Sequence, residues 1–267
     1  MTRRLEGRAA LITGASSGIG RATALACSRE GMKVALMARG PEAIEELAGR
    51  IRAGGGEALS VPGDVSREED CVRAVSETER SFGTIDVLVN NAGYGLIAWF
   101  EETPPEEAAR IVRVNLLGSF YTTRAALPGM KGRRSGHILF VSSGVGKKGI
   151  AGYALYAATK FGQVGLADAL RAEVAPLGIA VSVVFPISTQ TRFRSAMSRP
   201  GPAFPPPAGG PVQSAEHVAR SIVKCLKRPR PEVYPFPPLR WLSAFNQLFP
   251  ALGSRLVGSV RRPPPRA

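Results

Sequence analysis

Six short apolar runs alternate along this chain with longer segments of helical periodicity. The apolar runs are Ala9–Thr13, Lys33–Ala38, Ala58–Val61, Ile85–Val89, His137–Ser142 and Ile179–Phe185. The helical segments between them are Ile19–Glu30, Pro41–Ala53, Arg67–Phe82, Pro105–Met130 and Tyr153–Ala175. Strands that are apolar on both faces are typical of a parallel sheet covered by helices on both sides. The alternation therefore predicts a doubly wound α/β fold with three layers, α/β/α.

The chain length and a change of composition after the last apolar run predict one domain with an extension. The 267 residues suit one large α/β domain, which we expect over residues 1–235. Within it, residues 187–213 are rich in Pro, Gly and Ser, which is typical of a lid. Residues 236–267 are expected to form a basic, amphipathic extension with helical spacing of apolar side chains over Leu239–Val260.

The composition predicts a cytoplasmic protein without a metal site. The chain is 44% hydrophobic, and no apolar run approaches the roughly 18 residues of a transmembrane helix. The basic N-terminus lacks the apolar region and cleavage site of a signal peptide. Three scattered cysteines and two histidines predict neither a disulfide framework nor a zinc site.

The net charge of +14 is concentrated toward the C-terminus. From Arg220 onward the chain has ten basic residues and one acid, Glu232, so nine of the fourteen excess charges lie there. A basic protein can attract nucleic acid, an anionic membrane or an acidic protein. Because the sequence contains no RNP motif, zinc finger or base-reading helix, we expect no nucleic-acid partner.

A glycine-rich turn follows the first predicted strand and opens the first predicted helix. Glycines let the backbone turn tightly and approach a pyrophosphate, whose charge then lies at a helix N-terminus with free N–H groups. In this position the turn predicts dinucleotide binding. The residues expected to meet the pyrophosphate are Gly14, Ser16, Ser17, Gly18, Ile19 and Gly20.

The end of the second predicted strand indicates which dinucleotide binds. An NAD site commonly has an Asp or Glu there, which accepts a hydrogen bond from the ribose 2′-hydroxyl. Here the position is Ala38, and the next residue, Arg39, can pair with a 2′-phosphate and stack on adenine. We therefore expect NADP(H) in preference to NAD(H). If Arg39 is only a solvated loop charge, both cofactors are usable.

Tyr156 and Lys160 lie one turn apart on the same face of a predicted helix. An ammonium about 4 Å from a phenol, at an effective dielectric of about 20, can lower the phenol pKa of about 10 by up to about three units. The pair is therefore suited to donating or accepting a proton near neutral pH.

From about residue 5 to residue 190 the sequence resembles the short-chain dehydrogenase/reductase family. The resemblance implies a Rossmann-type fold and hydride transfer between a nicotinamide and a carbonyl or secondary alcohol. It rests on six motifs in the family order, which are the TGxxxGIG turn from Thr13, Asp64-Val65, Asn90-Asn91-Ala92-Gly93, Asn115-Leu116-Leu117-Gly118, Ser142-Ser143 and the YxxxK pair from Tyr156.

The resemblance also implies a catalytic role for four residues. Ser143 would hydrogen-bond the substrate oxygen, and Tyr156 would donate the proton in reduction. Lys160 would hold the nicotinamide ribose and depress the tyrosine pKa, while Asn115 would anchor a water that relays protons. Ser142 and Tyr153 are the neighbouring alternatives to Ser143 and Tyr156, and they match the family positions less well.

The chain departs from the family pattern after the sixth apolar run. The family has Pro-Gly followed by a threonine, whereas here Pro186 is followed by Ile187 and Thr191 keeps the threonine position. A branched residue in place of glycine constrains the turn, so the departure affects the lid rather than the hydride chemistry. Beyond the glycine-rich turn, the implied cofactor contacts are Arg39, Asp64, Val65, Asn91, Ala92, Gly93, Tyr156, Lys160, Pro186, Thr189 and Thr191.

The expected substrate pocket is largely apolar. Such a pocket favours a lipophilic ketone, aldehyde or alcohol over a sugar or a charged acid, with simple packing of the lid as the competing interpretation of half of these side chains. The pocket residues are Ser143, Val145, Tyr153, Tyr156 and Phe193, with Tyr94, Leu96, Met197 and Phe204 around them.

Two other functions are open from the sequence. The chain also resembles 3-oxoacyl-[acyl carrier protein] reductases, and an acidic carrier protein would find basic side chains at Lys131, Arg133, Arg134 and Arg171. The extension after residue 230 is unlike the short C-terminus of those reductases. A non-catalytic NADP(H)-binding sensor is the other alternative, and the complete catalytic set argues against it.

Two kinds of macromolecular contact are expected. Helices such as Pro105–Met130 and Tyr153–Ala175 commonly form subunit contacts in this family, so the resemblance implies a homodimer or homotetramer. The segment Leu239–Val260 has two interpretations. It buries its apolar face in a subunit interface or over the active site, or it makes a peripheral contact with an anionic membrane.

Overall fold

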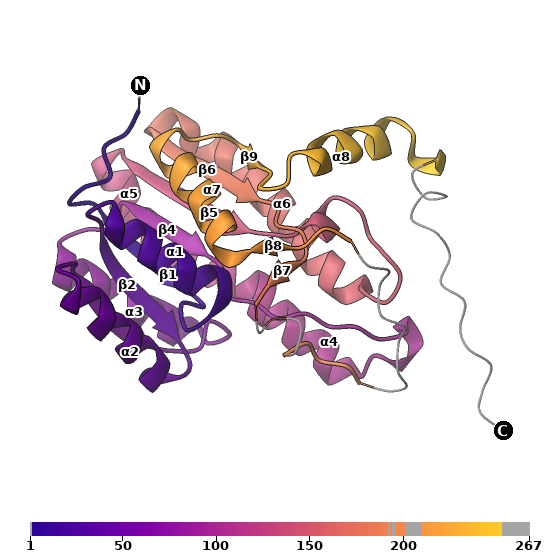
Figure 1. Ribbon diagram of the computed structural model, residues 1–267, viewed down its shortest axis with the longest axis horizontal. Coiled ribbons are helices and arrows are strands. Elements are labelled where there is room, and N and C mark those ends of the chain that lie inside the picture. Colours follow the sequence, from indigo (N-terminus) through magenta and orange to yellow (C-terminus); the bar gives the residue numbers. More distant parts are fainter. Residues whose placement is uncertain (1, 192, 194–195, 201–209, 253–267) are drawn as a thin grey trace.

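The central sheet has seven parallel strands (Figure 1). The computed structural model describes residues 2–191, 193, 196–200 and 210–252. Within them the strand order is β3-β2-β1-β4-β5-β6-β9, which confirms the predicted doubly wound, Rossmann-type fold. The strands are β1 (Ala9–Thr13), β2 (Lys33–Ala38), β3 (Ala58–Pro62), β4 (Val87–Asn90), β5 (Gly136–Val141), β6 (Ile179–Val184) and β9 (Glu232–Val233).

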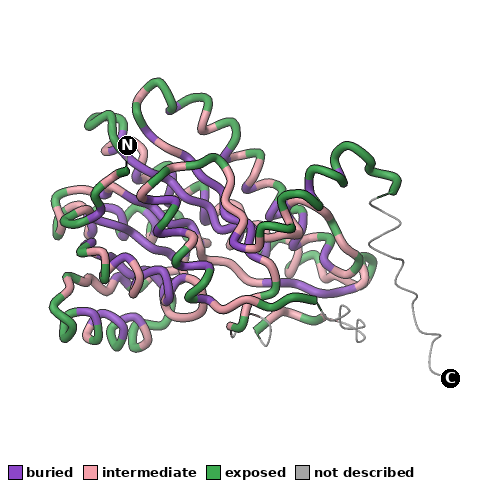
Figure 2. The backbone as a smooth tube through the Cα atoms, turned by 45° about the horizontal axis from the view of Figure 1, so that its top comes forward, coloured by how far each residue is buried: buried purple, intermediate pink, exposed green. Residues whose placement is uncertain are grey.

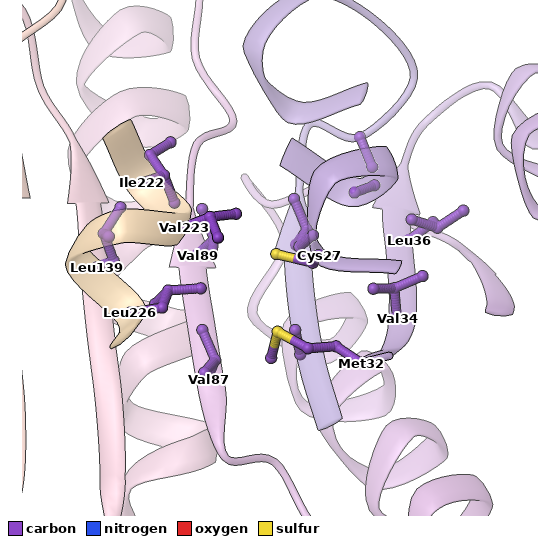
Figure 3. Close-up of a cluster of buried hydrophobic side chains, with 14 of the residues drawn as sticks. Cys27, Met32, Val34, Leu36, Val87, Val89, Leu139, Ile222, Val223 and Leu226 are labelled. Atoms are coloured by element: carbon purple, nitrogen blue, oxygen red, sulfur yellow. The ribbon is translucent and has the colours of Figure 1, made fainter. Parts of the chain in front are cut away.

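Helices cover both faces of the sheet through two separate buried clusters. Because successive side chains of a strand point to opposite faces, Ile12 of β1 packs in one cluster and Leu11 in the other. Figure 3 shows the first cluster, where Cys27 and Leu226 face the sheet. Its helices are α1 (Gly18–Arg29), α2 (Pro41–Ala53) and α7 (Ala215–Lys227), and those of the second are α3 (Glu68–Phe82), α5 (Gly118–Arg133) and α6 (Ala154–Val174).

The helix predicted over Pro105–Met130 is interrupted. α4 (Pro105–Val112) and α5 are joined by a turn of π-helix at Arg113–Leu117. A π turn widens the backbone hydrogen bonding from i+4 to i+5 and is frequent at functional sites. It holds Asn115, which is fully buried. The apolar periodicity of a single segment does not reveal such a one-residue insertion.

The chain after β6 contains the segment predicted as a lid and the helix α8. β7 (Thr189–Gln190) and β8 (Gln213–Ser214) pair in parallel at the base of the predicted lid. α8 (Pro238–Leu248) follows β9, projects from the body of the molecule and is exposed along most of its length (Figures 1 and 2). Phe204 and residues 253–260, which belong to the predicted pocket and amphipathic segment, lie outside the described residues.

Shorter elements complete the described part of the chain. Three-residue 3-10 helices lie at Phe100–Glu102, Gly144–Gly146 and Ala175–Leu177. The strand β9 was not predicted because two half-buried residues leave no apolar run in the sequence. No helix in the described ranges has both the length and the apolar character needed to cross a bilayer.

Candidate active site

The candidate site lies at the carboxyl ends of four neighbouring strands. The glycine-rich turn follows β1, the Asn91–Gly93 segment follows β4, Ser143 follows β5 and Pro186 follows β6. The strand order reverses between β1 and β4. Doubly wound sheets bind their ligands at this edge and at this reversal, so the topology brings the predicted residues to the place where a ligand binds.

The turn between β1 and α1 is packed tightly against the loop after β4. Gly14 has a φ of 66°, and a Cβ at this position would lie 2.8 Å from the Ala92 Cα. The Asn91 side-chain amide donates to the carbonyl oxygens of Thr13 and Gly14 at 3.0 and 3.2 Å. The Thr13 hydroxyl accepts hydrogen bonds from the Asn91 and Ala92 backbone at 3.0 Å each. Asn91 and Ala92 thus hold the shape of the turn.

The N-terminus of α1 fits a pyrophosphate. Ser17 is the N-cap, its side chain makes no capping hydrogen bond, and the first turn of the helix contains no acidic residue. Free N–H groups and the positive end of the helix dipole therefore suit an anion. Gly18 has a φ of 55°, and a Cβ there would lie 3.0 Å from the Thr191 Cγ2, so glycine keeps the space between turn and lid open. Donors and space together fit a dinucleotide.

Three residues at the ends of β2 and β3 border the expected adenosine position. Arg39 is exposed at the end of β2 and has no hydrogen-bond or ion-pair partner among the described residues. The Asp64 carboxylate accepts a hydrogen bond from the Ser66 backbone at 2.9 Å. Val65 is buried against α5, where a Cβ on Gly118 would lie 2.9 Å from it. Arg39 is therefore the side chain in this region that is free to meet a ligand charge.

Ser143 and Tyr156 meet through their hydroxyl groups. Ser143 is the N-cap of the 3-10 helix Gly144–Gly146, and Tyr156 lies in the first turn of α6 with 6% of its surface exposed. Burial raises the pKa of the Tyr156 phenol, and its hydrogen bond with Ser143 opposes this rise. The site therefore holds a protonated phenol beside a second hydroxyl, which suits donation of hydrogen bonds to one substrate oxygen.

Lys160 shares the face of α6 with Tyr156 as predicted, and its ammonium lies over the Tyr156 ring. The Lys160 Nζ lies 5.7 Å from the Tyr156 ring centroid. It donates to the Val141 carbonyl oxygen at 2.8 Å and to the Gln163 Oε1 at 3.1 Å. Burial lowers the pKa of Lys160 to about 7. Burial is the main influence on the pKa of both groups, and it opposes the lowering of the tyrosine pKa that the lysine is predicted to cause.

Asn115 is held by protein groups on every side. Its Nδ2 donates to the Tyr94 carbonyl oxygen at 2.9 Å, and its Oδ1 accepts from the Tyr94 backbone N–H at 3.0 Å. Its own carbonyl oxygen accepts from Ser119 Oγ at 3.0 Å and from Gln163 Nε2 at 2.7 Å. Asn115 thus clamps the loop after β4 to the π turn. Neither Ser119 nor Gln163 is predicted from the sequence, where the one signal is a glutamine on a largely apolar helix.

Ser142 and Tyr153, the neighbouring alternatives, are less favourably placed for catalysis than Ser143 and Tyr156. Ser142 is buried behind the site, where its hydroxyl donates to the Lys160 carbonyl oxygen at 3.0 Å. Tyr153 is the N-cap of α6, and its ring centroid is 6.3 Å from that of Tyr156. The geometry therefore brings Ser143, rather than Ser142, next to Tyr156.

An apolar cluster surrounds the paired hydroxyls. Phe193, in the segment predicted as a lid, has its ring centroid 5.8 Å from that of Tyr156. Ser198 is held against the loop after β4. Its backbone exchanges hydrogen bonds with Gly95 and Ile97 at 2.9 and 3.0 Å. The cluster contains the predicted Tyr94, Leu96, Val145, Tyr153, Phe193 and Met197, together with Ile97, Ile111, Val112, Ile150 and Leu155, which were not predicted.

The comparisons with known proteins agree on one family. Residues 8–200 match the short chain dehydrogenase family. Ketoacyl reductase HetN of Nostoc sp. is 33% identical over 229 residues, which cover 86% of this chain and 78% of HetN. The 3-dehydrosphinganine reductase of Danio rerio is 36% identical over 193 residues, 70% of this chain and 58% of that protein. The glycine betaine reductase ATRR of Emericella nidulans is 36% identical over 228 residues, 84% of this chain.

The chain spans only part of two of these relatives, 18% of ATRR and 58% of the Danio rerio reductase. Two solved structures share the fold. A short chain dehydrogenase/reductase from Burkholderia phymatum in complex with NAD has a TM-score of 0.83 at 24% identity, over 98% of this chain and 99% of that one. An alcohol dehydrogenase from Thermococcus sibiricus complexed with 5-hydroxy-NADP has a TM-score of 0.76 at 31% identity, over 85% and 95%.

The family match covers most of the chain, including the glycine-rich turn and the loops and helix that bring Ser143 and Tyr156 together. The strand order is that of a sheet that binds a dinucleotide at its reversal. The chain belongs to the short-chain dehydrogenase/reductase family.

Proposed function

We propose that this chain reduces an apolar ketone or aldehyde with NADPH, or oxidises the corresponding alcohol with NADP+. The observation that carries the proposal is the hydrogen bond between Ser143 and Tyr156 beneath the apolar cluster of lid and loops. Two hydroxyl donors in an apolar environment suit a carbonyl oxygen whose substituents are themselves apolar.

A nicotinamide bound at this site supplies the hydride in the reduction. The Ser143 hydroxyl donates a hydrogen bond to the carbonyl oxygen and stabilises the charge that develops there. The Tyr156 phenol transfers its proton to the same oxygen, which becomes the hydroxyl of the product. Lys160 holds the ribose side of the site and stabilises the phenolate that remains on Tyr156. Asn115 holds the loop after β4 in register with these groups.

The preference for NADP(H) rests on Arg39. Ala38 leaves no carboxylate at the end of β2, and the unpaired Arg39 guanidinium is exposed beside the expected adenosine position. A 2′-phosphate gains a charge-assisted hydrogen bond there and meets no repulsion. The fold itself accepts either cofactor, since the similar structures include complexes with NAD and with 5-hydroxy-NADP.

The proposed substrate is a carbonyl on a long apolar chain. The support is the apolar cluster, together with similarity to a ketoacyl reductase and to a 3-dehydrosphinganine reductase. Reduction of 3-oxoacyl-[acyl carrier protein] is the second candidate, and similarity to HetN favours it. A free lipid ketone and a carrier-bound thioester differ in their need for a protein partner, so assays with each substrate separate the two candidates.

We also propose self-association through α5 and α6. Phe120 of α5 and Phe161 of α6 are 42% and 44% exposed, which leaves large apolar side chains on the faces that subunit contacts of this family commonly use. A second copy would cover them. Size-exclusion chromatography with light scattering tests this, since Phe120→Glu should convert an oligomer to a monomer.

For the C-terminal helix we propose a peripheral contact with an anionic lipid surface from a cytoplasmic protein. α8 is oriented with its polar side inward, because Ser243 and Asn246 are 4% and 8% exposed whereas Trp241 and Leu248 are 73% and 74% exposed. Residues 236–267 contain five arginines and no acid, which complements anionic headgroups. The α8 residue Leu239 lies against Gly144, the neighbour of Ser143, so a bound membrane would lie near the site.

The experiment that tests the catalytic proposal is NADPH oxidation with a panel of apolar aldehydes, long-chain ketones and acetoacetyl thioesters. Wild type is compared with Tyr156→Phe, and NADH is run in parallel. We expect turnover with apolar ketones that Tyr156→Phe reduces by roughly a hundredfold or more, since a positioned acid contributes about 10²–10⁴. Tight NADPH binding without turnover on any carbonyl would instead favour the non-catalytic sensor.

A further inference from the structure

Gln163 is a fully buried polar side chain on α6, one turn after Lys160. Its Oε1 accepts a hydrogen bond from the Lys160 Nζ at 3.1 Å. Its Nε2 donates to the Asn115 carbonyl oxygen at 2.7 Å and to the Ser119 hydroxyl at 2.9 Å. One amide therefore links the lysine of the site to the π turn that carries Asn115.

The orientation of this amide is determined by its partners. A backbone carbonyl oxygen only accepts hydrogen bonds, so the Gln163 NH2 group must face Asn115. The Gln163 oxygen then faces Lys160, whose ammonium only donates. The reversed amide would place two donors against each other and two acceptors against each other. The network thus permits one arrangement, in which Lys160 meets an acceptor.

The Asn115 carbonyl lies within the π turn, where the Gly118 N–H bonds back five positions to the Arg113 oxygen. Here the two acceptor positions of the Asn115 oxygen are filled by Ser119 and Gln163. A water on this carbonyl, which the family resemblance implied as a proton relay, would therefore compete with the Gln163 amide.

The surroundings of Lys160 make a neutral acceptor important. Val141 of β5 and Asn115 of the π turn offer only uncharged groups, and a Cβ on Gly93 would lie 3.7 Å from the Nζ. Tyr156 is the neighbouring titratable side chain, and no acidic side chain opposes the ammonium among the described residues. Burial therefore disfavours the charged lysine, and two carbonyl acceptors are what stabilise it.

We propose that Gln163 is a positioning residue for the proposed reductase reaction. Its fixed amide holds the Lys160 ammonium toward the site, in the place where a water relay was expected. It touches neither substrate nor the reacting atoms. Because the amide neither gains nor loses a proton at these pH values, it fixes the position of the lysine without itself relaying protons.

Two substitutions at Gln163 test this in opposite directions. Gln163→Glu places a carboxylate beside the ammonium and stabilises its charged form. The alkaline limb of the pH–rate profile for reduction should therefore move to higher pH by one unit or more. Gln163→Leu removes the acceptor, so the same limb should move to lower pH and kcat should fall about tenfold to a hundredfold. The KM for the carbonyl substrate should change little in both variants.

Unfolding of the cofactor-free protein tests the contact independently of activity. The folded pKa of Lys160 is about 7 and the ordinary value is 10.5, so the unfolded chain binds more protons between them. Stability from this group therefore rises with pH in that window. In urea titrations at several pH values, the rise should begin at higher pH in Gln163→Glu and at lower pH in Gln163→Leu. Ala53→Glu, exposed at the end of α2, should follow wild type.

The outcomes separate the inference from the proposed function. Parallel shifts in both variants, or none, in rate and in unfolding would overturn the role of Gln163, even if both variants are less stable. If wild type reduces no carbonyl, the proposed function fails, and the opposite shifts in unfolding still decide whether Gln163 controls Lys160.

Discussion

The side-chain amide of Asn91 donates to the Gly14 carbonyl oxygen at 3.2 Å, and this contact joins the loop after β4 to the glycine-rich turn. A second bond from the same amide to Thr13 has a length of 3.0 Å. The turn that faces the expected pyrophosphate is therefore held by a residue from a different strand. Asn91 would therefore act on a bound cofactor through the backbone of the turn.

Replacement of Asn91 by alanine should weaken both the fold and the cofactor site. The change leaves two carbonyl acceptors without their partner, which should lower the free energy of unfolding by about 1–3 kcal/mol. NADPH affinity should fall as well, because the turn is less well ordered. Urea unfolding and a fluorescence titration with NADPH measure the two effects. Unchanged NADPH affinity at reduced stability would mean that the turn keeps its shape without Asn91.

Arg39→Ala should reverse the cofactor preference. Loss of a charge-assisted hydrogen bond to the 2′-phosphate is worth about 1.5–3 kcal/mol, so kcat/KM for NADPH should fall roughly tenfold to a hundredfold. The value for NADH should stay nearly constant, since that cofactor lacks the phosphate. Arg29→Ala, exposed at the end of α1, is the matched control for loss of positive charge. Equal losses with both cofactors would show that Arg39 does not determine the cofactor preference.

His137 should make the fold sensitive to acid. Its Nε2 pairs with the Ser182 hydroxyl at 2.8 Å, and burial lowers its pKa to about 3 from an ordinary 6.5. Between these values the unfolded chain binds the additional proton, so stability is complete above pH 6.5 and is lost as the pH falls toward 3.

The slope from this group should approach about 1.4 kcal/mol per pH unit within that window. Urea unfolding at pH 7, 6, 5 and 4 should show a steeper loss of stability in wild type than in His137→Phe, whose side chain binds no proton. Identical slopes would show that His137 is not the buried group that titrates.

Membrane contact by α8 should depend on its exposed apolar side chains. Wild type should sediment with vesicles that contain phosphatidylglycerol and much less with pure phosphatidylcholine, because both apolar insertion and anionic headgroups are needed. Trp241→Ala combined with Leu248→Ala should abolish sedimentation. Phe100→Ala is the control for loss of an exposed apolar side chain, since Phe100 begins a 3-10 helix and is 72% exposed.

Fluorescence of Trp241 gives a second measure of the same contact. Its emission should shift to shorter wavelength with anionic vesicles in a Trp99→Phe background, where Trp241 is the remaining tryptophan. If the double variant instead loses self-association while wild type does not bind vesicles, α8 forms a subunit interface rather than a membrane contact.

Much of the fold could be predicted because each strand is marked by its own residues. The bounds of β1 and β2 are those of the apolar runs Ala9–Thr13 and Lys33–Ala38, since burial on both faces leaves a local signature. β9 has two residues and no such signature, and its place beside β6 depends on the rest of the sheet. The π turn at Arg113–Leu117 likewise has no periodicity of its own.

For the candidate site, the residues that share a helix face or a strand end could be predicted from the sequence alone. The four-residue spacing of Tyr156 and Lys160 is sufficient for that, because helical geometry is local. The direction of the Lys160 ammonium and the pKa values of both groups could not be predicted in this way. Those properties depend on Val141, from β5, and on the burial of the whole site, and neither a distant carbonyl nor the local dielectric is encoded in the spacing of a motif.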